Sequence, residues 1–150
     1  MEEKLPQSIQ IEHEEFHEQL AKAMKAGGKT AEAAVGVMKV LQPHMAREEE
    51  LVSPALALLA PVSAGRITPE MASFLPKAAA FKEELPRMLQ QHGRIVEALR
   101  TLMQVAIEEQ QSGFAKLAQK LILHAQGEEE VLYPAAILVG EMLKIKLSER

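Results

Sequence analysis

Residues 44–54 read HMAREEELVSP, and residues 124–134, which lie 80 positions later, read HAQGEEEVLYP. Each copy has a histidine, a glutamate four residues after it, and a proline at its end. Because residues four apart lie on the same face of a helix, the histidine and the glutamate of each copy point the same way. The repeat predicts two related helical halves that place the same polar groups on one face.

A further histidine precedes each copy of the repeat. His13 lies 31 residues before His44, and His92 lies 32 residues before His124. Each histidine falls on an apolar stripe whose members are three or four residues apart, as on the buried face of a helix. Around His92 the stripe contains Leu85, Leu89, His92, Val96 and Leu99. Around His124 it contains Leu117, Leu121, His124, Glu128, Val131, Ala135 and Leu138. The polar residues therefore interrupt faces that are otherwise apolar.

Clusters of Gly, Pro and Ser divide the chain into four long segments, so we expect helices over roughly 8–27, 30–60, 69–110 and 112–147. Short connections favour antiparallel neighbours. The predicted fold is an all-α, up-down-up-down four-helix bundle, a single domain over 1–150 made of two hairpins related by a pseudo-twofold repeat. Thr30 and Ser112 are expected to cap their helices, and the prolines at 43, 54, 76, 86 and 134 are expected to kink or break them.

The composition excludes several classes of function. The chain has no cysteine, so disulfides, thiolate metal sites and a cysteine nucleophile are excluded. Its net charge of −4 and its five Tyr and Phe residues give little attraction for phosphates or bases, so nucleic-acid binding is not expected. No apolar run approaches the length of a membrane span, and the first residues do not resemble a signal peptide. We therefore expect a soluble, cytoplasmic protein with no membrane partner.

A metal site explains the buried glutamates best. A carboxylate on an apolar face must be paired, protonated or metal-bound, because burying it bare costs several kcal/mol or more. Imidazole with carboxylate and without sulfur suits iron or manganese, with zinc possible. Without metal, we expect the pKa of Glu48 and of Glu128 to be raised by burial. The candidate ligands are His13, His17, His44, Glu48, His92, His124 and Glu128.

This pattern resembles the hemerythrin-like, or HHE cation-binding, domains, which have one histidine on each of four helices and H-x-x-x-E on the second and fourth. The resemblance covers nearly the whole chain. It implies a non-haem di-iron centre with an oxo or hydroxo bridge, with Glu48 and Glu128 as bridging carboxylates. In the best-known members such a centre binds dioxygen reversibly, and other members are similar to sensors of oxygen, iron or nitric oxide, or handle iron.

Two departures from oxygen-carrying hemerythrins bear on function. Those proteins have a fifth histidine four residues after the third-helix ligand, where this chain has Val96, and an aspartate where it has Glu128. His17, one turn after His13, could supply the missing imidazole. The predicted function is a di-iron protein that binds or senses dioxygen or a related diatomic, more a binding protein than an enzyme, with a homodimer possible. The alternatives are iron storage or handling and a di-iron oxidase or peroxidase.

Overall fold

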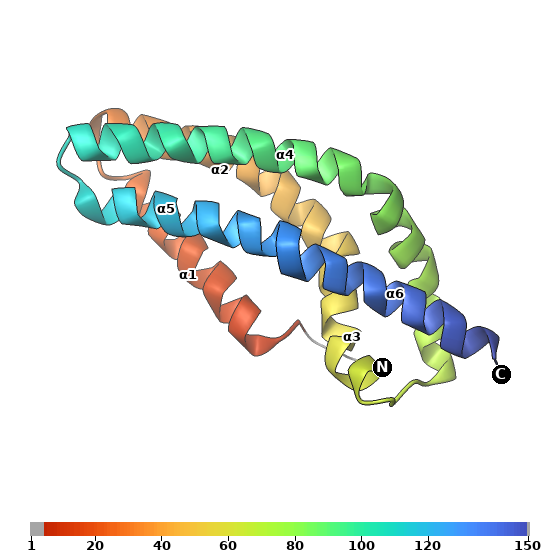
Figure 1. Cartoon of the computed structure of the whole chain (residues 1–150). Helices are drawn as coiled ribbons and strands as arrows, with labels where there is room; N and C mark the ends of the chain where they lie inside the picture. Colours follow the sequence, from red (N-terminus) through yellow and green to blue (C-terminus); the bar gives the residue numbers. More distant parts are fainter. Residues whose placement is uncertain (1–4, 150) are drawn as a thin grey trace.

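The computed structural model describes residues 5–149 and contains only helical elements in that range. They are α1 (Gln7–Ala23), α2 (Gly28–Leu51), α3 (Ser53–Ser63), the 3-10 helix η1 (Pro69–Phe74), α4 (Leu75–Glu108), α5 (Ser112–Gly127), the π-helix η2 (Glu128–Leu132) and α6 (Tyr133–Ser148). Figure 1 shows the chain running back and forth along one long axis, with α1 the shortest rod. The prediction of an all-α four-helix bundle is confirmed.

Three of the four predicted helices are interrupted. The second breaks at Val52, between α2 and α3, and the third begins as a 3-10 helix. The fourth passes through the π-helix between α5 and α6. The prolines account for two of these interruptions: Pro54 and Pro134 lie in the first turns of α3 and α6, and a proline has no N–H to donate to the preceding turn. Pro43 and Pro86 lie inside continuous helices, so no break occurs there.

The fourth rod of the bundle consists of α5, η2 and α6. The π-helix η2 changes which residues of this rod face inward. Its wider turn inserts one residue into the helical register, so the stripe predicted from Glu128 onward is wrong. Val131 is 61% exposed and Leu138 is 67% exposed. The buried positions after the π-helix are Tyr133, Ala136, Val139, Gly140 and Leu143. A phenol ring therefore enters the interior five residues after Glu128, at the end of the π-helix.

The apolar stripe predicted for the third rod, which consists of η1 and α4, also differs in part from the face that is buried. His92 and Leu99 are buried as expected, but Leu89 is 40% exposed. Met88 and Ile95, each one position before a predicted member, lie in the core instead. The buried residues Met88, His92, Ile95, Leu99, Leu102 and Ala106 keep the alternation of four and three residues, so the predicted period is right and the phase of the stripe is wrong.

Neither Thr30 nor Ser112 caps its own helix. The carboxylate of Glu109 instead accepts hydrogen bonds at the start of α2, from the N–H and the hydroxyl of Thr30 (2.6 Å each) and from the N–H of Lys29 (3.1 Å). A carboxylate at this position complements the partial positive charge of the helix N-terminus. Gly28 has a φ of +63°, and a Cβ there would lie 2.5 Å from Oε2 of Glu109, so a larger residue would be strained and would displace this carboxylate. The cap thus connects the two hairpins at one end of the bundle.

The interior consists of two apolar clusters with a polar layer between them. One cluster packs α1, α2, α4 and α5 around Leu20, Val37, Leu99, Leu102 and Leu121. The other packs α3, η1, α4 and α6 around Leu56, Phe81, Met88 and Leu143. Along α2, α4 and the fourth rod, the candidate ligands fall between residues of the two clusters. No helix within residues 5–149 is long and apolar enough to cross a membrane.

Candidate metal centre

Six of the seven candidate ligands meet in the polar layer, where they form two adjacent groups of donor atoms. The first group contains His44, Glu48, His92 and Glu128, and the second contains His13, His124 and Glu128. Within each group the donor atoms lie within 4.8 Å of one another. Glu128 belongs to both groups, so one carboxylate is shared between two potential ion positions.

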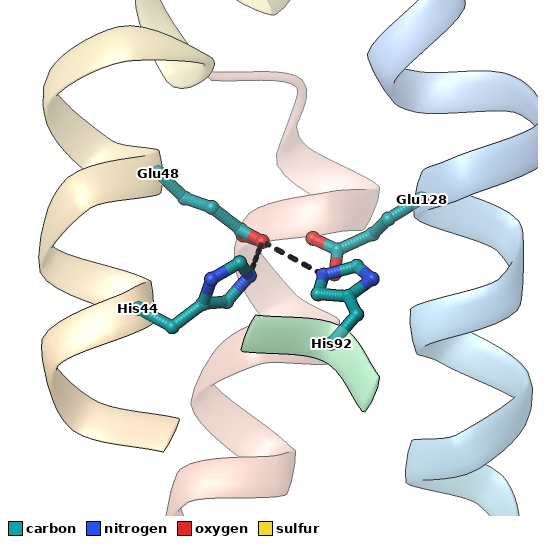
Figure 2. Close-up of side chains that lie close together, drawn as sticks. All are labelled: His44, Glu48, His92 and Glu128. Carbon is teal, nitrogen blue, oxygen red and sulfur yellow. Dashed lines mark ion pairs between the residues drawn. The ribbon is translucent and has the colours of Figure 1, made fainter. Parts of the chain in front are cut away.

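The first group is almost fully buried. Its four residues are each 6% exposed or less. Figure 2 shows their side chains converging from α2, α4 and the fourth rod, with Glu48 paired to both histidines. Oε1 of Glu48 lies 2.8 Å from Nε2 of His44 and 3.8 Å from Nε2 of His92, and Oε1 of Glu128 lies 3.3 Å from Nε2 of His92. Ligands ~2.0–2.2 Å from one metal lie roughly 3–3.5 Å apart, so small shifts of these side chains would allow them to share one ion.

The second group lies on the α1 side of the layer. Nε2 of His13 and Nε2 of His124 are 3.2 Å apart, and Nε2 of His124 lies 3.6 Å from Oε2 of Glu128. The two oxygens of Glu128 therefore face different groups, Oε1 the first and Oε2 the second. His13 is half-buried and comes from α1, the shortest rod in Figure 1. This group is the more accessible of the two.

In three of the histidines, Nε2 faces the donor groups and Nδ1 contacts a side-chain oxygen of another residue. Nδ1 of His44 lies 2.7 Å from Oε1 of Gln91, Nδ1 of His92 lies 3.0 Å from Oε1 of Glu129, and Nδ1 of His124 contacts the carboxylate of Glu12. With Nδ1–H donating to these oxygens, each Nε2 would present its lone pair to a metal in the layer once its own proton is lost. An acceptor of this kind fixes the tautomer and increases the basicity of a metal-binding histidine. The sequence analysis missed all three acceptors, since each lies on a different helical element from its histidine and no local pattern pairs them.

A small cavity of about 40 Å³ adjoins both groups. Besides the donor residues, its wall contains the apolar side chains of Phe16, Leu41, Ile95, Leu99 and Leu121. A cavity needs only ~10–15 Å³ to hold a water molecule, so this one has room for a molecule of two or three atoms. Because all six donor residues line this cavity, it includes the space that metal ions would occupy.

A comparison with family models identifies the family of this chain. The model described as "Hemerythrin HHE cation binding domain" matches residues 8–136. The chain belongs to this family. No curated protein and no solved structure matches it. The match includes both copies of the repeat and every residue of the two donor groups, so the buried His/Glu cluster that could hold metal lies within a hemerythrin HHE domain.

The charges of the metal-free hemerythrin site compensate one another. Burial opposes the charged form of His92, but its hydrogen bonds to Glu128 and Glu48 outweigh burial and raise the pKa of His92 to about 10. Burial likewise favours a raised pKa for Glu48, yet hydrogen bonds from His44 and His92 reverse this and hold it well below its ordinary value. The expectation of a raised pKa is therefore wrong for Glu48, because protonated histidines neutralise the buried carboxylate.

The sequence reading also missed Tyr133. Its hydroxyl lies 2.6 Å from Oε1 of Glu48, 2.9 Å from Nε2 of His92 and 3.1 Å from Nε2 of His44. The residue is 1% exposed, and burial together with the charges of Glu48 and Glu128 raises its pKa far above the ordinary value. The tyrosine was visible in the second copy of the repeat, but a regular helical register with Glu128 inward leaves position 133 off the buried face.

The structure does not bring His17 into either donor group. Its side chain is exposed, although it contributes to the wall of the cavity. His13, one turn earlier on α1, is the α1 residue that meets His124. The role of His17 as a ligand stays a prediction.

Proposed function

We propose that the protein holds two non-haem iron ions, one at each donor group, and binds dioxygen or a related diatomic molecule beside them. The observation that carries the proposal is the sharing of Glu128, whose two oxygens face different groups of histidines. A carboxylate shared in this way is how helical bundles hold a pair of metals. The donor set of imidazoles and carboxylates suits iron.

The cavity supports a gaseous ligand more than the storage of iron. Apart from the donor residues and His17, its wall is apolar and has no further carboxylate to attract additional cations, whereas it accommodates a small uncharged molecule. Reduced iron supplies the electrons that such a molecule needs in order to bind. The side chains of this domain hold the ions, exclude bulk water and leave an apolar space next to the donors.

The test begins with metal analysis of protein produced with ample iron. We expect about two iron ions per chain. The anaerobically reduced protein is then exposed to dioxygen, and in a second sample to nitric oxide, while the absorption spectrum is recorded. We expect a spectral change with dioxygen that reverses when the gas is removed. A chain that binds no iron, or a reduced iron form that does not respond to either gas, would contradict the proposal.

A pair of matched variants tests the cavity separately from the metal. Leu121 is buried and borders the cavity, whereas Leu123 on the same helix is 67% exposed. Leu121→Phe should reduce the space beside the donors and weaken dioxygen binding at unchanged iron content. Leu123→Phe makes the same change in side chain at the surface and should leave both properties unchanged. Equal gas binding in the two variants would place the gas elsewhere.

A further inference from the structure

Tyr133 lies against the first donor group. Its hydroxyl oxygen lies between 2.6 and 3.1 Å from three donor atoms of the first group, on Glu48, His92 and His44. A phenol has one hydrogen to donate and two lone pairs, so this single oxygen can donate to Glu48 and accept from the two histidines. It thus belongs to the same cluster of atoms as the candidate ligands.

The spacing of these atoms is that of a common coordination shell. Ligands bound ~2.1 Å from one ion and at right angles to each other lie about 3 Å apart. Nε2 of His44 and Oε1 of Glu48 are 2.8 Å apart, and the hydroxyl of Tyr133 lies at similar distances from each of them. The hydroxyl therefore lies among the atoms that would surround an ion in the first group.

The π-helix is what brings the hydroxyl to this place. Tyr133 follows Glu128 by five residues, which in a regular α-helix of 3.6 residues per turn is a rotation of about 140° from the face of Glu128. In a π-helix the fifth residue returns to the same face. The π-helix spans Glu128–Leu132, which is the interval between the two residues. Such helical insertions are frequent at functional sites.

The related position in the first half of the chain has no such group. The residue 80 positions before Tyr133 is Ser53, at the start of α3 after a helix break. By the pseudo-twofold repeat, Ser53 corresponds to a ligand of the second group, with His13 and His124. A serine hydroxyl extends only one bond beyond Cβ, whereas the phenol oxygen of Tyr133 reaches across the layer to Glu48 on α2. The two ion positions are therefore unlike.

We infer that Tyr133 is a protein ligand of the ion held by His44, Glu48, His92 and Glu128, an inference that rests on the proposed function. Binding replaces the O–H bond of the phenol by a bond between oxygen and metal, and the proton leaves to solvent. The additional ligand occupies a position at the buried ion that the second ion keeps open. A small molecule then binds at the ion held by His13 and His124, the side that is nearer to solvent.

The composition of the chain makes the test direct. Tyr133 is the single tyrosine, and there is no cysteine, so a phenolate-to-iron charge-transfer band in the visible spectrum has one possible source. We expect the ferric protein to show this band and tyrosinate vibrations in its resonance Raman spectrum. Growth on ring-deuterated tyrosine should shift those vibrations in the unmodified protein, which makes the measurement independent of any variant.

Variants then assign the band. Tyr133→Phe keeps the ring in the core and should retain two iron ions while the band and the vibrations disappear. Ser53→Ala, at the related position, should retain both. A wild-type protein with two ferric ions but no tyrosinate vibrations would overturn the inference and leave the proposed function intact. A wild-type protein without iron would contradict the proposed function instead, so the two failures are distinguishable.

Discussion

The carboxylate of Glu129 lies 3.0 Å from Nδ1 of His92, on the side of the imidazole ring opposite to Glu48 and Glu128. Glu129 itself is 42% exposed at its side chain, so it joins a buried histidine to the surface of the bundle. It acts on the candidate ligand without belonging to either donor group. This contact gives the most specific test of how the surrounding residues prepare the site.

Glu129→Ala should weaken metal binding by about 10–100-fold, because His92 loses the acceptor that fixes its tautomer and orientation. Competition with a chelator of known affinity measures the change. Glu130→Ala serves as the control, since Glu130 is an exposed neighbour that contacts Gln126 and not a histidine. Equal metal affinities for the two variants would show that the contact of Glu129 with His92 has no role in binding.

The two glutamates of the repeat should differ in their effect on metal content. Glu128 belongs to both donor groups, whereas Glu48 belongs to the first group alone. We therefore expect Glu128→Ala to lose both ions and Glu48→Ala to keep about one, held by His13 and His124. Metal analysis after desalting gives the result. Full occupancy in Glu128→Ala would show that its carboxylate is not shared.

His17→Ala should retain both ions, because the side chain of His17 is exposed and lies outside both donor groups. His13→Ala, one turn earlier on the same helix, is the matched variant and should lose the ion of the second group. The iron content of the two proteins is compared after identical loading. A loss of iron in His17→Ala would restore the sequence-based view that His17 is a seventh ligand.

The stability of the metal-free protein should have a maximum in mildly acidic solution. His92, with its pKa raised from 6.5 to about 10, contributes stability that is complete below pH 6.5 and is lost as the pH rises toward 10. Glu48, with its pKa lowered below 4.5, contributes stability above pH 4.5 that is lost as the pH falls through its native pKa. The melting temperature should therefore be highest between about pH 4.5 and 6.5.

Thermal unfolding of the chelator-treated protein at several pH values measures this profile. In His92→Gln the decline between pH 6.5 and 10 should become smaller, since the group that loses its proton there is absent. A metal-free protein that gains stability below pH 4.5 would contradict this account. That result would favour the earlier expectation that the buried glutamates carry raised pKa values and are relieved by protonation.

The sequence by itself determined the class of fold and most of the candidate site. The repeat at an interval of 80 residues, together with one histidine before each copy, predicted a helical bundle. It also identified the six residues that meet in the polar layer. This worked because helical geometry is local. Residues three or four positions apart share a face whatever the rest of the chain does, and a carboxylate on an apolar face is costly enough to indicate a partner.

The tertiary structure decided the features that depend on a change of register or on contacts between distant segments. The π-helix at Glu128–Leu132 adds one residue to a turn, which moves Val131 to the surface and Tyr133 into the core. No period of three and four residues contains such an insertion. The pairing of Glu129 with His92 joins residues 37 positions apart, and the cap of Glu109 on Thr30 joins residues 79 positions apart. These contacts form only when the helices pack, because their energies depend on distances across the bundle that a local pattern does not specify.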